Sequence, residues 1–229
     1  MCPKLHGWSR PSERPRGVIV LALDTCLGAC SAAVAEDERI LAVCSEPMTR
    51  GHQERLAPMA RDVMAGAGVP FVDLDRIGVT VGPGSFTGLR VGMAFAKGLA
   101  VALGRPCVGV GTLEALAATC GATGRCAAVI DAGRGFLYLQ VFEAGSALTA
   151  PAILPLEIAA ARLADLSSPG ETTLVGPGVA LLIDRLPGAR GLRLAAPAPE
   201  TVARLAGRAS AAPARPLYLR EPDARPRAG

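Results

Sequence analysis

Short apolar runs that end at polar or glycine residues recur along the 229-residue chain. The run at residues 18–23, VIVLAL, is continuous and stops at Asp24, which is typical of a strand buried on both faces. Residues 29–35 and 40–44 are predicted as two more strands, because the charged segment 36–39 between them favours a hairpin turn. The chain therefore begins with three predicted strands.

A helical period replaces this pattern after the third strand. Leu56, Met59, Ala60 and Val63 are spaced for one face of a helix, so residues 52–64 are predicted as a helix with Pro58 in its early turns, where it can kink the helix. The elements predicted next are a strand at 77–81, a helix at 85–103, a strand at 107–110 and a helix at 112–119.

The second half of the chain repeats this order. Its first apolar run, residues 127–130, stops at Asp131 as the first run stops at Asp24, and the tetrapeptide VGPG occurs at 81–84 and again at 175–178. These echoes favour a duplicated βββαβα unit, with coincidence in an Ala/Gly-rich chain as the alternative. The remaining predicted elements are strands at 136–142, 148–154 and 173–175, the first two joined by a turn at 144–145, a helix at 156–164 and a last helix at 201–212 capped by Thr201.

The same pattern predicts how the chain divides. We expect a disordered tail at 1–17, an N-terminal lobe at 18–122, a smaller second lobe at 123–199, and a C-terminal helix with an Arg/Pro-rich tail at 200–229. The tail lacks the apolar core of a signal peptide, and the longest apolar stretch, 91–103, is interrupted by Lys97 and too short to span a bilayer. The sequence therefore predicts a cytoplasmic protein with no membrane contact.

Composition narrows the classes of function. The net charge of +4 permits nucleic-acid contact without requiring it, and aromatic residues at 3% argue against base stacking as the main activity. The seven cysteines are scattered and are interpreted as small buried side chains in a reducing compartment. With two histidines, His6 and His52, a histidine metal site or a Ser-His-Asp triad is not expected, and Ser85 has no evident base partner.

Two like units, each with an aspartate at the end of its first strand, are typical of the actin-like (ASKHA, ribonuclease H-like) α/β fold. In that fold nucleotide lies between the lobes and the aspartates organise Mg²⁺ through water. The loop at 26–30 has one glycine and no basic residue, so we expect weak or vestigial ATP/ADP binding and no resident cofactor or metal; the alternative is that each aspartate binds turn amides. The predicted vestigial cleft consists of Asp24, Thr25, Asp131, Gly133, Gly176 and Gly178.

The stretch VTVGPGSFTGLRVG at 79–92 has the form of a phosphate-binding loop but lacks GxxxxGK[ST], and Pro83 has no N–H to donate. Small residues recur every four positions in the helix that follows it, at Gly88, Gly92, Ala96 and Ala100. Such a stripe allows another helix to approach closely. We therefore expect part of this helix to pack on its own sheet and the rest to meet a helix of another chain.

These residues resemble the TsaB (YeaZ) family, whose members act in making N6-threonylcarbamoyladenosine beside the tRNA anticodon. The resemblance runs from about Val18 to Arg220, and its central motif is highly specific. The motifs that carry it are LALDT at 21–25, His52 with LAP at 56–58, VGPGSFTGLRVG at 81–92, AFAKGLA at 94–100, VIDAGRGFLY at 129–138 and PLYLR at 216–220.

The resemblance implies a non-catalytic subunit that pairs with the transferase TsaD, is joined by the ATPase TsaE, self-associates when alone, and reaches tRNA through the complex. TsaD carries a His-x-x-x-His metal pair where this chain has Thr112 and Leu116, which cannot replace two imidazoles. Pairing is expected through the helices at 52–64 and 85–103, and replacing Gly92 with Phe is expected to block it without unfolding. The interface residues expected are His52, Leu56, Met59, Val63, Ser85, Gly88, Leu89, Gly92, Met93 and Ala96.

Three other functions are weighed against this one. A stand-alone actin-like ATPase or kinase is favoured by Asp24 and Asp131 but lacks good phosphate loops. A peptidase lacks a nucleophile–base–acid set and metal ligands. A direct tRNA binder would use the Arg-rich segment 204–227, for which a solvated tail is the alternative.

Overall fold

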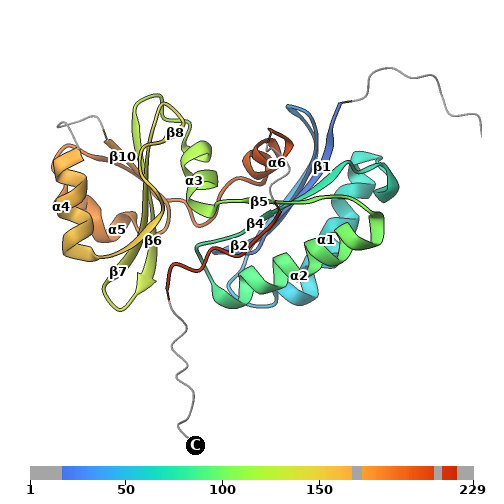
Figure 1. Cartoon of the computed structure of the whole chain (residues 1–229), viewed down its shortest axis with the longest axis horizontal. Helices are drawn as coiled ribbons and strands as arrows, with labels where there is room; N and C mark the ends of the chain where they lie inside the picture. Colours follow the sequence, from blue (N-terminus) through green and yellow to red (C-terminus); the bar gives the residue numbers. More distant parts are fainter. Residues whose placement is uncertain (1–16, 167–171, 209–212, 221–229) are drawn as a thin grey trace, which may run out of the picture.

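The computed structural model describes residues 17–166, 172–208 and 213–220, which form two α/β units side by side (Figure 1). The first sheet has the strand order β3-β2-β1-β4-β5, and the second has β11-β10-β6-β7-β8, with β9 also paired to β7. The strands of the first sheet are β1 (Ile19–Asp24), β2 (Ala29–Glu36), β3 (Arg39–Pro47), β4 (Arg76–Thr80) and β5 (Cys107–Val110). Those of the second are β6 (Arg125–Gly133), β7 (Phe136–Glu143), β8 (Ser146–Ala147), β9 (Ala152–Pro155), β10 (Thr172–Val175) and β11 (Arg190–Leu192).

The two sheets share one topology. In each, the first strand is antiparallel to the second and parallel to the strand that follows the hairpin unit: β1 to β2 and β4, and β6 to β7 and β10. The predicted duplicated, actin-like α/β fold is therefore confirmed. The helices are α1 (His52–Ala67), η1 (Phe71–Asp73), α2 (Phe86–Leu103), α3 (Thr112–Cys120), α4 (Leu156–Leu166), α5 (Val179–Leu182), η2 (Ile183–Arg185) and α6 (Pro199–Arg208).

The repeated tetrapeptide VGPG does not mark equivalent places in the two halves. In the first sheet, Asp24 lies beside Thr80, immediately before the tetrapeptide begins. In the second, the first residue of the tetrapeptide, Val175, pairs with Ala128, three residues before Asp131. The duplication is therefore carried by the order and direction of the strands, and the two tetrapeptides differ in register.

Two predicted elements differ in detail. The strand predicted at 148–154 begins only at Ala152, as β9, and the short β8 precedes the predicted range. Thr149 lies in a bend, where its hydroxyl accepts a hydrogen bond from the Val141 amide at 3.0 Å. The last helix begins at Pro199 and not at Thr201, so the predicted Thr201 cap is wrong. Proline suits the first helical position, since its missing N–H has no partner there in any helix.

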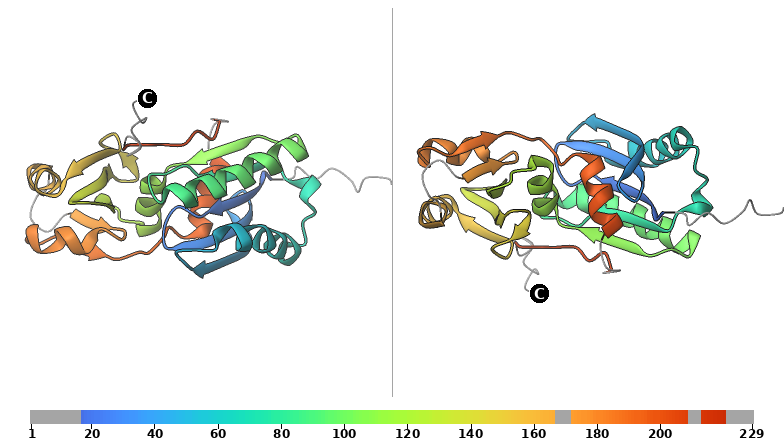
Figure 2. Two further views of the ribbon diagram at one scale, coloured as in Figure 1. Left: turned by 90° about the horizontal axis from the view of Figure 1, so that it is seen from below. Right: turned by 90° about the horizontal axis from the view of Figure 1, so that it is seen from above.

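Helices cover both faces of the first sheet. Helices α1 and α2 lie on one face, and α6, which follows the second sheet in the chain, returns to the other face (Figure 2). Val202, Ala203 and Ala206 of α6 pack against alanines of the sheet. Every residue of β1 is buried as a result, as predicted from its continuous apolar run.

A buried junction forms where β1 ends. The Asp24 carboxylate accepts hydrogen bonds from the Thr80 hydroxyl and, at 3.0 Å, from the Cys26 amide. The Thr25 hydroxyl donates at 2.7 Å to the carbonyl oxygen of Gly88 in the first turn of α2. Asp24 and Thr25 are each 1% exposed. The end of β1 is thereby connected to β4 and to the start of α2.

The glycines of α2 make this junction possible. A Cβ atom at Gly88 would collide with the carbonyl oxygen of Thr25, and one at Gly92 would lie 2.5 Å from the Thr25 hydroxyl oxygen. Ala96 is fully buried on the same stripe. The stripe therefore seats α2 on its own sheet, and the expectation that it faces another chain is wrong.

The first prediction concerns Gly92. We expect Gly92→Phe to lower the free energy of unfolding by about 3 kcal/mol or more, because the ring has no space beside Thr25. Urea denaturation followed by circular dichroism measures this. Gly98→Phe is the matched control, since Gly98 is exposed with no atom within 4 Å of an added Cβ. Equal stability of the two variants would contradict the packing described above.

The second prediction concerns Asp24, whose pKa is raised by burial despite its hydrogen bonds. Asp24→Asn retains an oxygen that accepts both hydrogen bonds and removes a buried charge, so we expect stability at or above wild type at neutral pH. Asp24→Ala leaves the Thr80 hydroxyl and the Cys26 amide without an acceptor, which costs about 1–3 kcal/mol.

The pH dependence of the Asp24 variants gives a second measurement. The folded protein holds the Asp24 proton more tightly than the unfolded chain does, so wild-type stability falls as pH rises through the raised pKa. Urea denaturation between about pH 5 and pH 8 should show a smaller fall for Asp24→Asn. If Asn and Ala destabilise the protein equally, the ionised carboxylate is needed and this explanation is wrong.

Candidate functional site

The structure does not bring the six predicted cleft residues to one surface. Asp24 and Thr25 are buried in the junction between β1 and α2. Gly176 and Gly178 are buried against β6, where added Cβ atoms would lie 2.5 Å and 2.8 Å from atoms of Val129. Their role in the fold is close packing of the turn after β10 onto β6. These four residues therefore have structural roles, and nucleotide binding stays a prediction.

The other two cleft residues, Asp131 and Gly133, are exposed at the β6–β7 hairpin. The Asp131 carboxylate accepts a hydrogen bond from the Gly133 amide at 2.7 Å, which is the turn-binding role considered as the alternative. Gly133 has a φ of 72°, a conformation that glycine adopts without strain. Within the described ranges, no group of three or more His, Cys, Asp or Glu side chains is arranged to hold a metal ion.

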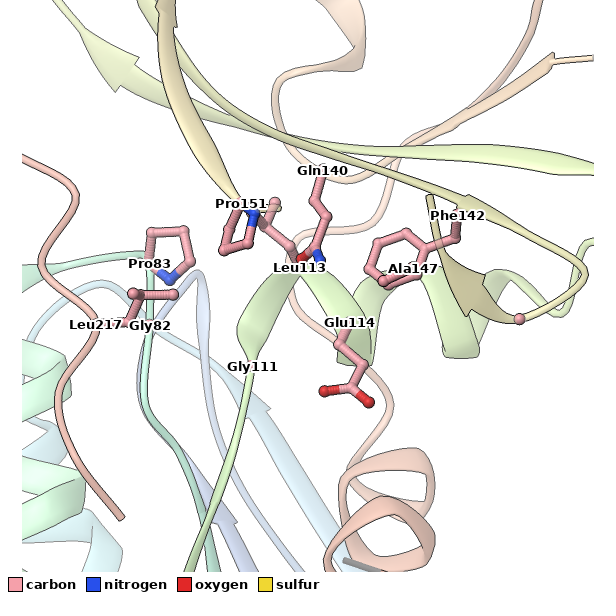
Figure 3. Close-up of a pocket in the computed structure, with 11 residues that line it drawn as sticks. Gly82, Pro83, Gly111, Leu113, Glu114, Gln140, Phe142, Ala147, Pro151 and Leu217 are labelled. Atoms are coloured by element: carbon pink, nitrogen blue, oxygen red, sulfur yellow. The ribbon is translucent and has the colours of Figure 1, made fainter. Parts of the chain in front are cut away.

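A pocket of about 280 Å³ lies between the two sheets (Figure 3). Its walls come from the turns after β4 and β5, from the first turn of α3, from β7 and the hairpin and loop that follow it, and from Leu217 of the C-terminal segment. Glu114 is its acidic residue, and Gln140 donates from its amide to the Thr149 carbonyl oxygen at 3.1 Å. None of the eleven lining residues is basic, so this pocket does not suit a triphosphate. They are Gly82, Pro83, Gly111, Leu113, Glu114, Gln140, Phe142, Gly145, Ala147, Pro151 and Leu217.

Nine of the ten residues predicted for the partner interface are buried within this chain. They lie in or beside the core between the first sheet and helices α1 and α2. They therefore lie beneath the exposed surface of these helices and do not form it. The exception is Ser85, which is exposed and whose hydroxyl oxygen accepts the Gly88 amide at 3.2 Å as the cap of α2. The nine are His52, Leu56, Met59, Val63, Gly88, Leu89, Gly92, Met93 and Ala96.

The side of α2 turned away from the sheet is also apolar, and we call it the outer face of α2. Val101 is 84% exposed, and its neighbours on this side are exposed or half-exposed. Polar Thr87, Arg90 and Lys97 are exposed on the same helix, so its exposed side as a whole is only partly apolar. Apolar residues on an exposed helix side are often covered by another element, which is the signal that could have identified this face from the sequence. The outer face consists of Val91, Ala94, Phe95, Gly98, Val101 and Ala102.

Length and composition alone would also allow α2 to cross a membrane. Among the described residues, α2 is the one helix that is long and apolar enough. Buried core helices of water-soluble proteins are often as long and as apolar. One third of α2 is buried inside the structure, and its inner stripe is fixed on β1 and β4 by the glycine contacts. The outer face is therefore the exposed side of a helix that is fixed on its own sheet.

The first turns of α1 and α2 border a second pocket, of about 290 Å³, next to the outer face. His52, the first residue of α1, is 7% exposed, and its Nε2 atom has no hydrogen-bond partner among the described residues. His52 lies close enough to Asp24 for the imidazole to lower the pKa of the carboxyl, opposing the larger effect of burial.

The cysteines fit a role in packing. Burial raises the pKa of the Cys26 thiol to about 12 and that of Cys30 to about 11, with Asp24 adding to both shifts. Burial likewise raises the pKa of Cys126 to about 12. Thiols with such high pKa values are weak nucleophiles at neutral pH. The six cysteines in the described part of the chain are all free.

Comparisons with known proteins agree with this geometry. Residues 42–178, more than half of the chain, match the family model of TsaD, tRNA N6-adenosine threonylcarbamoyltransferase. The chain is 36% identical over 168 residues to the tRNA threonylcarbamoyladenosine biosynthesis protein TsaB of Escherichia coli, covering 69% of this chain and 71% of that protein. It is 40% identical over 112 residues to a tRNA N6-adenosine threonylcarbamoyltransferase of Erythrobacter litoralis, which covers 42% of this chain and 33% of the transferase.

Among solved structures, YeaZ from Pseudomonas aeruginosa superposes with a TM-score of 0.73 at 32% identity, covering 88% of this chain and 99% of that one. A match of this length leaves neither lobe without a counterpart. The similarity to TsaB and YeaZ spans both lobes, whereas the similarity to the E. litoralis transferase covers less than half of the chain. The chain therefore belongs to the TsaB (YeaZ) family.

Proposed function

We propose that this protein is a non-catalytic scaffold subunit that pairs with the transferase TsaD to support N6-threonylcarbamoyladenosine modification of tRNA. The E. coli relative is named for this biosynthesis. The observation that carries the proposal is the apolar outer face of α2, because a helix fixed on one side and apolar on the other requires a cover. TsaE is proposed as the third member, and self-association as the state without a partner.

The structure of α3 supports a non-catalytic role. Thr112 and Leu116, which stand where we place the two metal-binding histidines of TsaD, are fully buried in this protein. Leu116 packs in the cluster between α3 and the second sheet. The Thr112 amide donates to the Gly82 carbonyl oxygen at 2.9 Å. These two positions therefore serve packing and cannot present ligands to a metal.

Helix α1 complements α2 as the second helix of the proposed interface. Its exposed positions include small residues, Ala57, Ala65 and Gly66, with Arg61 and Asp62 between them. Small side chains on α1 beside larger apolar side chains on α2 suit close packing of two helices from a second chain. A helix pair from TsaD, or from a second copy of this protein, would complete a four-helix contact.

The third prediction tests this surface at Gly98, in the middle of the outer face. We expect Gly98→Arg to abolish co-elution with TsaD of the same organism, because the change places a charge in an apolar contact. Size-exclusion chromatography of the co-expressed pair measures this. The variant should fold, since an added Cβ at this position meets no atom within 4 Å.

Gly98→Ala is the matched control for the pairing experiment. It should retain pairing and raise the free energy of unfolding by about 0.5–1 kcal/mol, as expected for replacing a glycine inside a helix. If Gly98→Arg still co-elutes with TsaD at the wild-type ratio, the partner binds elsewhere and the proposed face is wrong.

The fourth prediction concerns activity. TsaD from the same organism, assayed with tRNA and the remaining pathway components, should modify tRNA at least tenfold more slowly without this chain or with its Gly98→Arg variant. Mass spectrometry of digested tRNA measures the modified nucleoside. Full modification by TsaD alone would reject the scaffold role, whatever the outcome of the pairing experiment.

A further inference from the structure

A second surface feature begins where α2 ends. The C-terminal segment runs beside β5, with the Ala214 amide donating to the Cys107 carbonyl oxygen at 3.0 Å and Pro213 bridged to Val108. Between this segment and the last turns of α2 lies an open groove of about 580 Å³. It is lined by Lys97, Ala100, Val101, Gly104, Arg105, Cys107, Pro213, Ala214 and Arg215.

No acidic side chain balances the positive charge of the groove lining. Three of its nine lining residues, Lys97, Arg105 and Arg215, are basic, and none is acidic. Some basic side chains outside the groove form ion pairs, as in Arg125 with Glu143 at 2.7 Å and in the pairs of Arg55 and Arg185. Across residues 17–166, 172–208 and 213–220, the three groove cations form no such pair.

These cations are not needed to cap α2. Its last carbonyl groups accept hydrogen bonds from backbone amides: Ala100 from Arg105 at 2.9 Å, and Val101 from Gly104 at 3.3 Å. Arg105 also donates from its side chain to the Val72 carbonyl oxygen at 3.2 Å, which holds the guanidinium in place. Like charges at the edges of a concave surface focus an attractive potential for anions.

We propose that this groove binds the phosphate backbone of RNA, which in the proposed function is the tRNA being modified. Lys97 and Arg105 lie on one wall and Arg215 on the other, so a strand entering the groove meets cations from both sides. The lining contains no aromatic ring on which a base could stack. The groove therefore contacts phosphate and fixes the position of the RNA without reading its sequence.

The location of the groove suits a tRNA shared between two proteins. Val101 belongs both to the groove and to the outer face of α2, so the proposed partner and the proposed RNA site adjoin along one helix. The inference rests on the proposed function for the identity of the RNA. Binding is measurable on the full chain without TsaD, so a failure here is separable from a failure of pairing.

The fifth prediction uses labelled, unmodified tRNA and the full-length protein in fluorescence anisotropy over a range of salt concentrations. The triple variant Lys97→Gln, Arg105→Gln, Arg215→Gln should bind at least tenfold more weakly at low salt. The slope of log affinity against log salt should decrease in magnitude by about 2–3, since each lost phosphate contact removes roughly 0.7–0.9.

A control variant separates the groove from net charge. The triple variant Arg39→Gln, Arg162→Gln, Arg190→Gln also removes three positive charges, but from exposed positions outside the groove. It should lower the affinity less than threefold and leave the salt slope within about one unit of wild type. Equal losses in the two triple variants would show a general charge effect and overturn the proposal.

A local readout comes from Cys107, which is half-buried in the groove. Bound tRNA should slow its alkylation by N-ethylmaleimide, measured by mass spectrometry, while Cys44 on β3, also half-buried, should react at an unchanged rate. Unprotected Cys107 at saturating tRNA, or a wild-type protein that does not bind tRNA, would refute the RNA site. A groove variant that retains tRNA binding but loses TsaD or TsaE would show that the groove binds protein instead.

Discussion

The close contact between Thr25 and the first turns of α2 determines which side of α2 is exposed. The Thr25 hydroxyl donates to the Gly88 carbonyl oxygen, and the backbone at Gly88 and Gly92 approaches Thr25 too closely for any side chain at these two positions. This contact fixes both the distance of α2 from the first sheet and the rotation of α2 about its axis. Its opposite side, with Val101 at its centre, must therefore face outward.

The order of elements could be predicted because strands buried on both faces leave continuous apolar runs, and β1 is such a strand. The position of α6 could not be predicted, since nothing in its own residues shows that it returns to the first sheet. The register of the two VGPG segments could not be predicted from the sequence either. A register is set by pairing with β1 or β6, which are distant in the sequence.

The interface residues show a different limit of sequence reasoning. Periodicity identified the stripe of small residues on one side of α2, but apolar residues also lie on its exposed side, so it could not show which side meets the sheet. A stripe of glycine and alanine suits a neighbouring helix and a neighbouring strand end equally well. The buried hydroxyl of Thr25 decides between them, and this is a tertiary contact across 63 residues. The predicted interface residues lie on the side of α2 that its own sheet covers, and the partner contact stays a prediction.

The same packing bears on the proposed scaffold role of this actin-like fold. Its first-strand aspartate is here turned inward to Thr80 and Cys26, where burial raises its pKa and disfavours the charge that a nucleotide-bound Mg²⁺ would require. These contacts, with the Thr25 hydrogen bond to Gly88, hold β1, β4 and α2 together. Rigidity at this junction favours binding, because a surface that is already ordered loses less entropy when a partner covers it. An inward-facing Asp24 and an outward-facing apolar α2 are thus two consequences of one packing arrangement.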